Sequence, residues 1–170
     1  MKRLILIGGP MGVGKTTVCR LLQPRLSNCV FLDGDWCWDA RPFLVTERTK
    51  AMVLDNITHL LTAFLSCPDY HNVLFCWVLH DAAIWHSIES RLCLEGVRVC
   101  RAALVCSPQE LERRLRRDVD AGLRAPDVIP RSLERLALYP LLPGVPCLDT
   151  TGLSAEETLH SLAGRLCLPL

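Results

Sequence analysis

The chain has 170 residues, half of which are hydrophobic, and a formal net charge of +1. This length suits one domain with its own core, and the near-neutral charge argues against nucleic acid or an anionic membrane as a partner. No apolar run approaches the length of a membrane-spanning helix, so we expect a cytoplasmic protein whose partner is a small molecule.

The ten cysteines are scattered along the chain without any C-x-x-C pair. This spacing argues against a zinc site, and most of the cysteines lie in apolar runs where the thiol packs as a small hydrophobic group. We therefore expect reduced cysteines in a reducing compartment. Cys37 stands apart because it lies between Trp36 and Trp38, next to candidate site residues.

The first predicted element is a buried strand at residues 3–8, which leads directly into a phosphate-binding loop. Residues 9–16 read GPMGVGKT and match G-x-x-x-x-G-K-[ST]. Such a loop points backbone N–H groups at a phosphate, while Lys15 reaches the β and γ phosphates and Thr16 can bind Mg²⁺. A helix that begins near Lys15 adds its N-terminal dipole. The residues expected to hold the nucleotide are Gly9, Met11, Gly12, Val13, Gly14, Lys15, Thr16 and Thr17.

Two carboxylates follow the second predicted strand, at residues 28–33, which ends in Asp33-Gly34-Asp35. Ligands collect at the carboxyl edge of a doubly wound sheet, and residues two apart on an extended segment can point to the same side. One carboxylate can hold Mg²⁺, directly or through water, while the other accepts a proton from an attacking hydroxyl. The alternative is an Asp-Gly-Asp turn with solvated carboxylates.

Further apolar runs alternate with amphipathic stretches and predict the rest of the fold. Strands are expected at residues 73–79, 98–106 and 145–148, and helices at residues 46–66, 81–95 and 131–139. Two more helices are predicted to begin with capping boxes, Ser107 with Glu110 and Ser154 with Glu157. This order predicts an α/β domain in three layers, in which helices cover both faces of a five-stranded parallel sheet.

The helix after Ser107 carries four arginines at positions 113, 114, 116 and 117. They cannot all face one ligand, and a solvated face is the usual outcome, although Arg114 and Arg117 share a side of the helix. Residues 118–130 contain glycine and two prolines and are expected to form a mobile lid. Arg124, within this lid, is the best candidate to neutralise a phosphoryl group during transfer.

Through these motifs the chain resembles the small P-loop kinases of the shikimate kinase, gluconate kinase and nucleotide kinase group. The resemblance covers the whole chain and rests on the phosphate loop, the Asp-x-Asp after the second strand, the arginine-bearing helix and lid, and the segment Asp149-Thr150-Thr151. It implies a P-loop NTPase fold with strand order 2-3-1-4-5, ATP with Mg²⁺ as the phosphoryl donor, and a substrate-binding segment at residues 34–68.

The resemblance also implies roles for single residues. Asp33 would serve Mg²⁺ together with Thr16, and Asp35 would contact the substrate or act as the base. Arg124 would be the lid arginine. The residues implied near the adenine are Arg114, Asp149, Thr150 and Thr151. Arg135, with Tyr139 four residues later, resembles the substrate-side arginine of the shikimate kinases.

The acceptor side departs from the shikimate kinases. The third strand runs into His80-Asp81 instead of a glycine triplet, so shikimate is not the expected substrate. Asp81 could supply a metal-supporting carboxylate, and His80 is either a polar site group or a capping or solvated histidine. The candidate acceptor-binding residues are Asp35, Trp38, Arg41, His80 and Arg135.

The sequence thus predicts an ATP-dependent phosphotransferase. Its acceptor is expected to be a small metabolite that bears a hydroxyl or phosphate group, with nucleosides and nucleotides favoured. The alternative is a module that binds or hydrolyses a nucleoside triphosphate without phosphorylating an acceptor.

Overall fold

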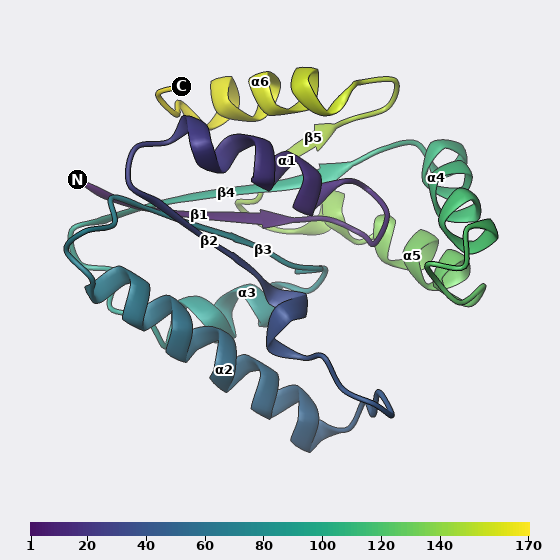
Figure 1. Ribbon diagram of the computed structural model, residues 1–170, viewed down its shortest axis with the longest axis horizontal. Coiled ribbons are helices and arrows are strands. Elements are labelled where there is room, and N and C mark those ends of the chain that lie inside the picture. Colours follow the sequence, from purple (N-terminus) through teal and green to yellow (C-terminus); the bar gives the residue numbers. More distant parts are fainter.

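A computed structural model describes all residues, 1–170, and contains one sheet of five parallel strands in the order β2-β3-β1-β4-β5 (Figure 1). The strands are β1 (Lys2–Gly8), β2 (Cys29–Asp33), β3 (Asn72–Cys76), β4 (Val97–Val105) and β5 (Cys147–Asp149). In the central register, Ile7 of β1 lies opposite Cys76 of β3 and Ala102 of β4. The predicted strand order and fold class are confirmed.

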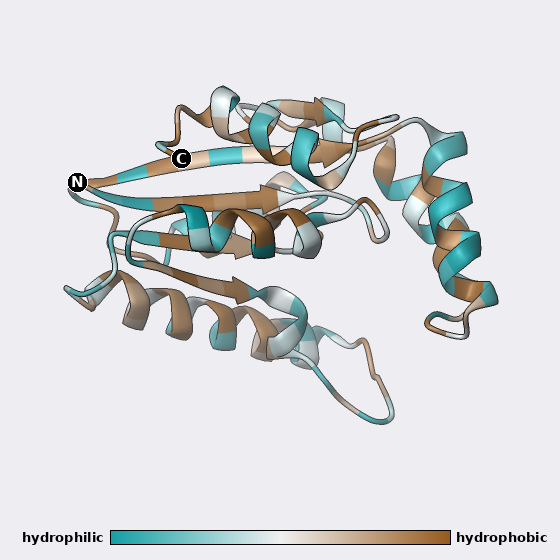
Figure 2. Ribbon diagram, turned by 45° about the horizontal axis from the view of Figure 1, so that its top comes forward, coloured by the Kyte–Doolittle hydropathy of each residue, from teal (hydrophilic) through white to brown (hydrophobic).

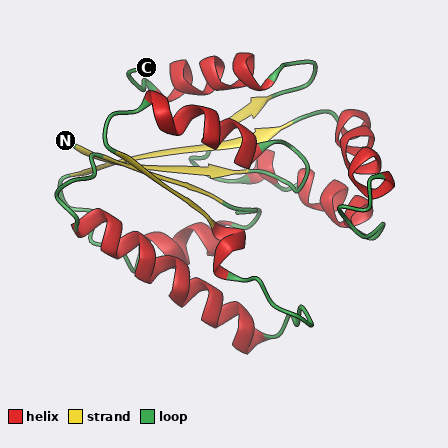
Figure 3. Ribbon diagram, in the orientation of Figure 1, coloured by secondary structure: helices red, strands yellow, loops and turns green.

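Helices cover both faces of the sheet and extend beyond its carboxyl edge (Figures 1 and 3). They are α1 (Lys15–Leu22), α2 (Glu47–Ser66), α3 (Ala82–Glu89), α4 (Pro108–Asp120), α5 (Val128–Leu136) and α6 (Ala155–Leu166). Helices α1 and α6 pack on one face, α2 and α3 on the other, and α4 with α5 beyond the strand ends. None of the helices combines the length and apolar character needed to span a membrane.

The hydrophobic core has two parts, one on each face of the sheet. Ile5 and Ile7 of β1 point into the part covered by α1 and α6, whereas Leu4 and Leu6 point into the part covered by α2 and α3. The brown strands of Figure 2 reflect this burial on both faces. Continuous apolar runs are therefore strands of a parallel sheet, as predicted.

Three regions hold the largest differences from the predicted boundaries. The strand expected at residues 73–79 ends at Cys76, because the carbonyls of Val78 and Leu79 leave the sheet and accept hydrogen bonds from the side chains of Tyr139 and Trp85. The helix expected to reach residue 95 ends at Glu89, although its apolar pattern continues through the buried Leu92 into a turn before β4.

The third difference concerns the region of the predicted lid. Helix α4 continues to Asp120, and α5 begins at Val128 instead of residue 131, because Pro130 lies in the first turn of α5, where a proline is tolerated. Only residues 121–127 remain as a connection between the two helices. The expected loop is therefore short, and helices frame it on both sides.

Of the two predicted capping boxes, only one is complete. Ser154 and Glu157 bond reciprocally at the start of α6. At α4 the Ser107 hydroxyl accepts from the backbone N–H of Glu110, but the Glu110 carboxylate binds Arg113 and Arg114 instead of the cap. The helix starts where the sequence predicts, while the glutamate serves the neighbouring arginines.

Candidate active site

The phosphate-binding loop connects β1 to α1, and its glycines are required by close approaches and by positive φ angles. Gly9, Gly12 and Gly14 have φ values of 147°, 80° and 104°. A Cβ on Gly9 would lie 2.7 Å from the carbonyl oxygen of Leu104, and one on Gly12 would lie 2.5 Å from the side chain of Leu115. The loop is therefore held tightly against β4 and α4.

Lys15 lies at the centre of this loop. Its ammonium group donates a 2.9 Å hydrogen bond to the carbonyl oxygen of Pro10. Burial lowers the pKa of Lys15, against the opposing effect of neighbours that include Asp35 and Asp33. A phosphate anion in the loop would supply the close negative charge that this ammonium group lacks.

Thr16 and Asp33 form a pair of hard oxygen donors beside Lys15. The Thr16 hydroxyl donates to the Asp33 carboxylate at 2.6 Å, and the second carboxylate oxygen of Asp33 accepts from the backbone N–H of Asp35 at 3.1 Å. No group of three His, Cys, Asp or Glu side chains is arranged to hold a metal ion. The donor set fits Mg²⁺, which typically binds one or two protein oxygens together with phosphates and water.

Asp81 does not join this pair. Its carboxylate caps α3 by accepting a 2.8 Å hydrogen bond from the backbone N–H of Ala83. The sequence allowed Asp81 a metal-supporting role, whereas in the structure its carboxylate caps α3.

A polar cavity of about 320 Å³ lies over the phosphate loop and has no hydrophobic lining residue. It is lined by Gly12, Gly14, Lys15, Thr16, Thr17, Arg113, Arg114, Arg117, Asp118 and Arg124. Four arginines and one lysine face a single acidic residue here, a balance that suits a polyphosphate. We call this space the phosphate cavity.

Arg124 enters the phosphate cavity from the connection between α4 and α5. Its Nε donates to the Asp118 carboxylate at 2.9 Å. Arg116 and Arg113 pair instead with Glu112 and Glu110 on the exposed side of α4. The predicted solvated face of this helix is thus present, although Arg113 also reaches the cavity.

Arg114 connects three parts of the site. Its guanidinium donates to the Glu110 carboxylate at 2.7 Å, to the Val13 carbonyl of the phosphate loop at 3.0 Å, and to the Thr150 carbonyl after β5 at 3.2 Å. Asp149 accepts two hydrogen bonds from Thr151, which lower the pKa of its carboxyl group. Of these residues only Arg114 lines the phosphate cavity, and residues 149–151 are held by bonds to one another and to Arg114.

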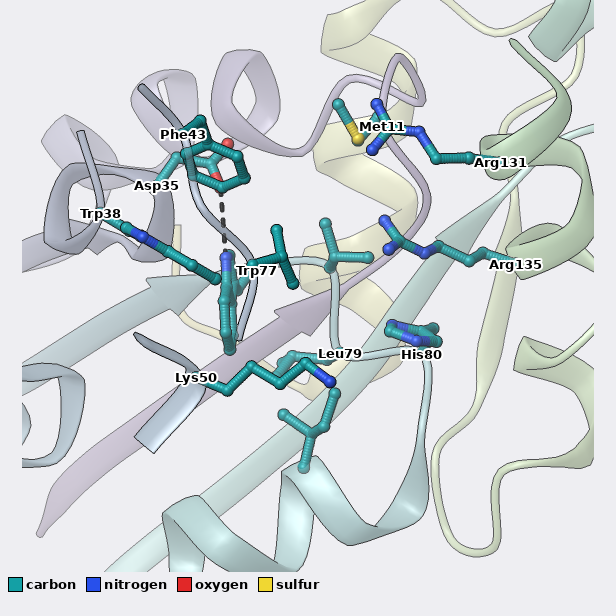
Figure 4. A pocket seen from close by; sticks show the side chains of 13 residues that line it. Met11, Asp35, Trp38, Phe43, Lys50, Trp77, Leu79, His80, Arg131 and Arg135 are labelled. Carbon is teal, nitrogen blue, oxygen red and sulfur yellow. Dashed lines mark hydrogen bonds between the residues drawn. The ribbon is translucent and has the colours of Figure 1, made fainter. Parts of the chain in front are cut away.

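A second cavity, of about 470 Å³, opens on the other side of the phosphate loop (Figure 4). Its lining is Met11, Asp35, Trp38, Phe43, Val45, Lys50, Trp77, Val78, Leu79, His80, Ile84, Arg131 and Arg135. The structure thus brings together four of the five residues predicted for acceptor binding. We call this space the acceptor cavity.

Three predicted residues lie elsewhere than expected. Arg41 is exposed and does not line the acceptor cavity, although Phe43 and Val45 of the same exposed segment do. Met11, expected at the nucleotide, lines the acceptor cavity, and the Val13 side chain is buried in the core. Only the backbone of Val13 can therefore face a phosphate.

Asp35 lines the acceptor cavity and is linked to the phosphate loop through Asp33, which accepts hydrogen bonds from the Asp35 backbone and from Thr16. One of its carboxylate oxygens accepts a 3.1 Å hydrogen bond from the indole N–H of Trp77, drawn as the dashed line in Figure 4. Although solvent reaches part of this side chain, removal of water by the surrounding protein raises the pKa of Asp35, and the nearby Asp33 raises it further. A carboxylate with a raised pKa is a stronger base.

The segment after β3 forms the floor of the acceptor cavity and is fixed by two side chains. The buried Tyr139 hydroxyl donates to the carbonyl of Val78, and the indole N–H of Trp85 donates to the carbonyl of Leu79 at 2.8 Å. His80 lies at the end of this segment with its Nδ1 buried and without a partner, and burial, followed by Arg135, lowers its pKa. Both effects favour the neutral form of His80, which lines the cavity wall.

The Cys37 thiol is not activated. Burial raises the pKa of Cys37, and Asp33 and Asp35 raise it further. A thiol with a raised pKa is a weak nucleophile at neutral pH. All ten cysteines are free in the structure.

Four residues of the acceptor cavity were not predicted individually from the sequence, namely Phe43, Lys50, Trp77 and Arg131. Arg131 precedes Arg135 by four residues, and the two therefore share one side of α5. This spacing could have indicated that Arg131 belongs to the same site as Arg135. Trp77 follows the third strand directly, at the edge where ligands collect, but only the folded structure joins it to Asp35.

Comparisons with known proteins agree with this architecture. Residues 5–123 match a protein family described as an AAA domain, whereas no curated protein matches the sequence. The Deinococcus radiodurans tunicamycin resistance protein has a similar structure, with a TM-score of 0.71 at 22% identity over 99% of this chain and 97% of that chain.

Two structures of kinases are also similar. A gluconokinase from Sinorhizobium meliloti 1021 has a TM-score of 0.70 at 16% identity, over 96% of this chain and 90% of that chain. The Mycobacterium tuberculosis APS kinase CysC, in complex with AMPPNP and APS, has a TM-score of 0.62 at 17% identity, over 96% of both chains. The chain therefore belongs to the AAA domain family, and it shares its fold with small P-loop kinases.

Proposed function

We propose that this protein is an ATP-dependent phosphotransferase that moves the γ-phosphoryl group to a hydroxyl of a small molecule, with nucleosides or nucleotides as the favoured acceptors. One observation carries the proposal. The carboxylate of Asp35 lines the acceptor cavity, and the backbone N–H of the same residue donates to Asp33, which also binds Thr16 of the phosphate loop. A base at this position can serve a hydroxyl that attacks a phosphate held by the loop.

In the proposed reaction, the acceptor hydroxyl oxygen attacks the γ-phosphorus of ATP. A new oxygen–phosphorus bond forms, the bond from the γ-phosphorus to the β,γ-bridging oxygen breaks, and ADP leaves. Asp35 takes the hydroxyl proton. Lys15 and Arg124 stabilise the negative charge that the phosphoryl oxygens carry during transfer.

The Thr16 hydroxyl is proposed to bind Mg²⁺ directly. The Asp33 carboxylate is proposed to support the ion as a hydrogen-bond acceptor. When bound, the ion neutralises charge on the β and γ phosphates. In the structure the two side chains bond to each other at 2.6 Å. This bond keeps both oxygens beside the phosphate loop.

We assign the chain as one kinase domain with two specialised segments, residues 34–68 for the acceptor and residues 118–130 as a lid. In the present arrangement Arg124 is paired with Asp118, and both side chains are about one-third exposed. An ion pair of this exposure is weak, so phosphoryl oxygens can replace Asp118 as the partner of Arg124. Exchange of this partner would draw the lid towards the nucleotide.

The nucleotide is proposed to lie with its phosphates on residues 9–17 and its base near the scaffold formed by Arg114 and residues 149–151. The gluconokinase and the APS kinase with bound AMPPNP support ATP as the donor and a small molecule as the acceptor. They differ from each other in acceptor. The acceptor of this chain therefore has to be sought in its own cavity.

The proposal is tested with two variants and a panel of nucleosides, nucleotides, sugars and antibiotics. We expect Lys15→Ala to abolish ATP binding measured by calorimetry. Asp35→Asn should retain ATP binding but lose acceptor-dependent ADP formation. A protein that only hydrolyses nucleotide would show the same ADP formation with and without every acceptor, and Asp35→Asn would leave that rate intact.

A further inference from the structure

We infer that the acceptor is a planar aromatic or heterocyclic alcohol that also carries an anionic group. This inference rests on the proposed function and narrows its acceptor class. It follows from the way in which aromatic and charged side chains are distributed within the acceptor cavity. Aromatic side chains gather at one end and arginines at the other, as Figure 4 shows.

The aromatic end consists of Trp38, Phe43 and Trp77. The rings of Trp38 and Phe43 lie with centroids 4.6 Å apart, and the indole of Trp77 is held in place by its bond to Asp35. Phe43 lines the cavity and yet remains 55% exposed. A planar ring bound against these side chains would cover exposed aromatic surface and leave its hydroxyl near Asp35.

The cationic end consists of Arg131 and Arg135 on one side of α5. Arg131 pairs with Asp127 at 3.0 Å, and across the cavity Lys50 pairs with Glu47 at 2.9 Å. Arg135 has no acidic partner in the protein, although it is half-buried and faces the cavity. A half-buried guanidinium without a partner favours an anion, so Arg135 is the residue assigned to the anionic group of the acceptor.

The lining also argues against a polyol acceptor. Eight of the 13 lining residues are hydrophobic, and Asp35 is the only carboxylate among them. A sugar acid bound here would leave several hydroxyl groups buried without partners, which is costly. The acceptor cavity therefore favours a ring with few polar groups.

The test compares three groups of probe acceptors in the presence of ATP and Mg²⁺. The first group combines ring, hydroxyl and anion, as in nucleoside 5′-monophosphates and hydroxymethyl-aryl carboxylates. The second lacks the anion, as in nucleosides and aryl alcohols, and the third lacks the ring, as in gluconate and glycerate. We expect kcat/KM for ADP formation to be about tenfold or more higher for the first group than for either other group.

Five variants, controls included, locate the effect. Arg135→Gln should remove the advantage in kcat/KM of the first group over the second, and Arg135→Lys should restore part of this advantage. Arg116→Gln, which removes an exposed charge of α4, should leave the advantage unchanged. Trp38→Leu should weaken binding of both ring-containing groups. Its control is Trp36→Leu, because Trp36 packs on Phe31 and Arg20 outside the acceptor cavity.

The outcomes separate this inference from the proposed function. Preference for gluconate or glycerate, or an equal loss for all groups in Arg135→Gln, would overturn the inference while leaving phosphotransfer intact. If no probe raises ADP formation, the proposed function is contradicted. Binding measured by tryptophan fluorescence then tests the inference separately. Quenching of this fluorescence by the first group of probes supports the inference, and lack of quenching by every probe overturns it.

Discussion

At the scale of single residues, Asp35 is the group on which the proposed chemistry depends. It is placed by β2 and the short turn after it, and it bonds to Trp77, which follows β3. Gly34 makes this possible, because a Cβ at that position would lie 2.5 Å from the Trp77 ring. The sequence predicted Asp35 as a base, and the structure adds the close contact with an indole.

The raised pKa of Asp35 predicts opposite effects on activity and stability. A raised pKa in the folded state means that the ionised carboxylate is less favourable in the fold than in the unfolded chain, so this group destabilises the fold at pH values above its folded-state pKa. Asp35→Asn should therefore raise Tm at pH 7 while acceptor phosphorylation is lost. The gain in Tm should shrink towards pH 4.

Calorimetric melting at pH 7 and pH 4 measures this effect. Asp39→Asn, at an exposed site nearby, is the matched control and should change Tm little at either pH. In the wild type, kcat/KM should decline in acid with an inflection above the ordinary aspartate pKa of about 3.9. A lower Tm for Asp35→Asn at pH 7 would contradict the inferred cost of ionising Asp35 in the folded state.

Arg124 should affect turnover far more than nucleotide affinity. If it contacts phosphoryl oxygens mainly during transfer, Arg124→Ala lowers kcat by about 10³-fold or more and leaves ATP affinity within a few fold. Steady-state kinetics and calorimetry with a non-hydrolysable ATP analogue measure the two quantities. Arg116→Ala is the control on α4, and equal losses in kcat and affinity for Arg124→Ala would show that Arg124 is not a lid arginine.

At the scale of elements, the site depends on how the chain leaves the strands. Residues 77–80 stay close to the sheet without belonging to it, because Tyr139 and Trp85 bond to the carbonyls of Val78 and Leu79. This segment carries Trp77 and His80 into the acceptor cavity. Two side chains from elsewhere in the fold thus replace the backbone hydrogen bonds that a longer strand would have made.

Tyr139→Phe is expected to loosen this segment. The change leaves the carbonyl of Val78 without its partner in the core, which should cost about 1–3 kcal/mol of unfolding free energy. The KM for the acceptor should rise more than the KM for ATP, since the floor lies on the acceptor side. Urea denaturation measures the unfolding free energy, and steady-state kinetics measures the two KM values. Tyr70→Phe is the control, because Tyr70 packs on Phe64 and its hydroxyl has no partner in the protein. A rise confined to the KM for ATP would argue against this role.

At the scale of the whole molecule, much of the architecture was predictable from the sequence. The five strands and the long helix α2 are confirmed, because buried strands produce continuous apolar runs and α2 begins at a Thr46 cap. The strand order is the one that the resemblance to small P-loop kinases implied. The phosphate loop was predictable because its chemistry is local. Its glycines, Lys15 and Thr16 are neighbours in the chain.

The acceptor cavity was only partly predictable, since it is assembled from distant segments. Phe43 and Lys50 flank or begin α2, Trp77 follows β3, and Arg131 belongs to α5. No local pattern states that these side chains meet. The sequence also did not predict which of several possible partners a side chain binds. Glu110 binds two arginines instead of completing a capping box.

The most direct test of the central claim is the fate of the γ-phosphoryl group. ATP labelled at the γ-phosphorus is incubated with the wild-type protein, Mg²⁺ and the best acceptor of the panel, and the products are separated. We predict that the label appears in the organic acceptor, with one ADP formed for each label transferred, and that Asp35→Asn loses this product. Label found only in inorganic phosphate, at the same rate with and without the acceptor, would contradict the account.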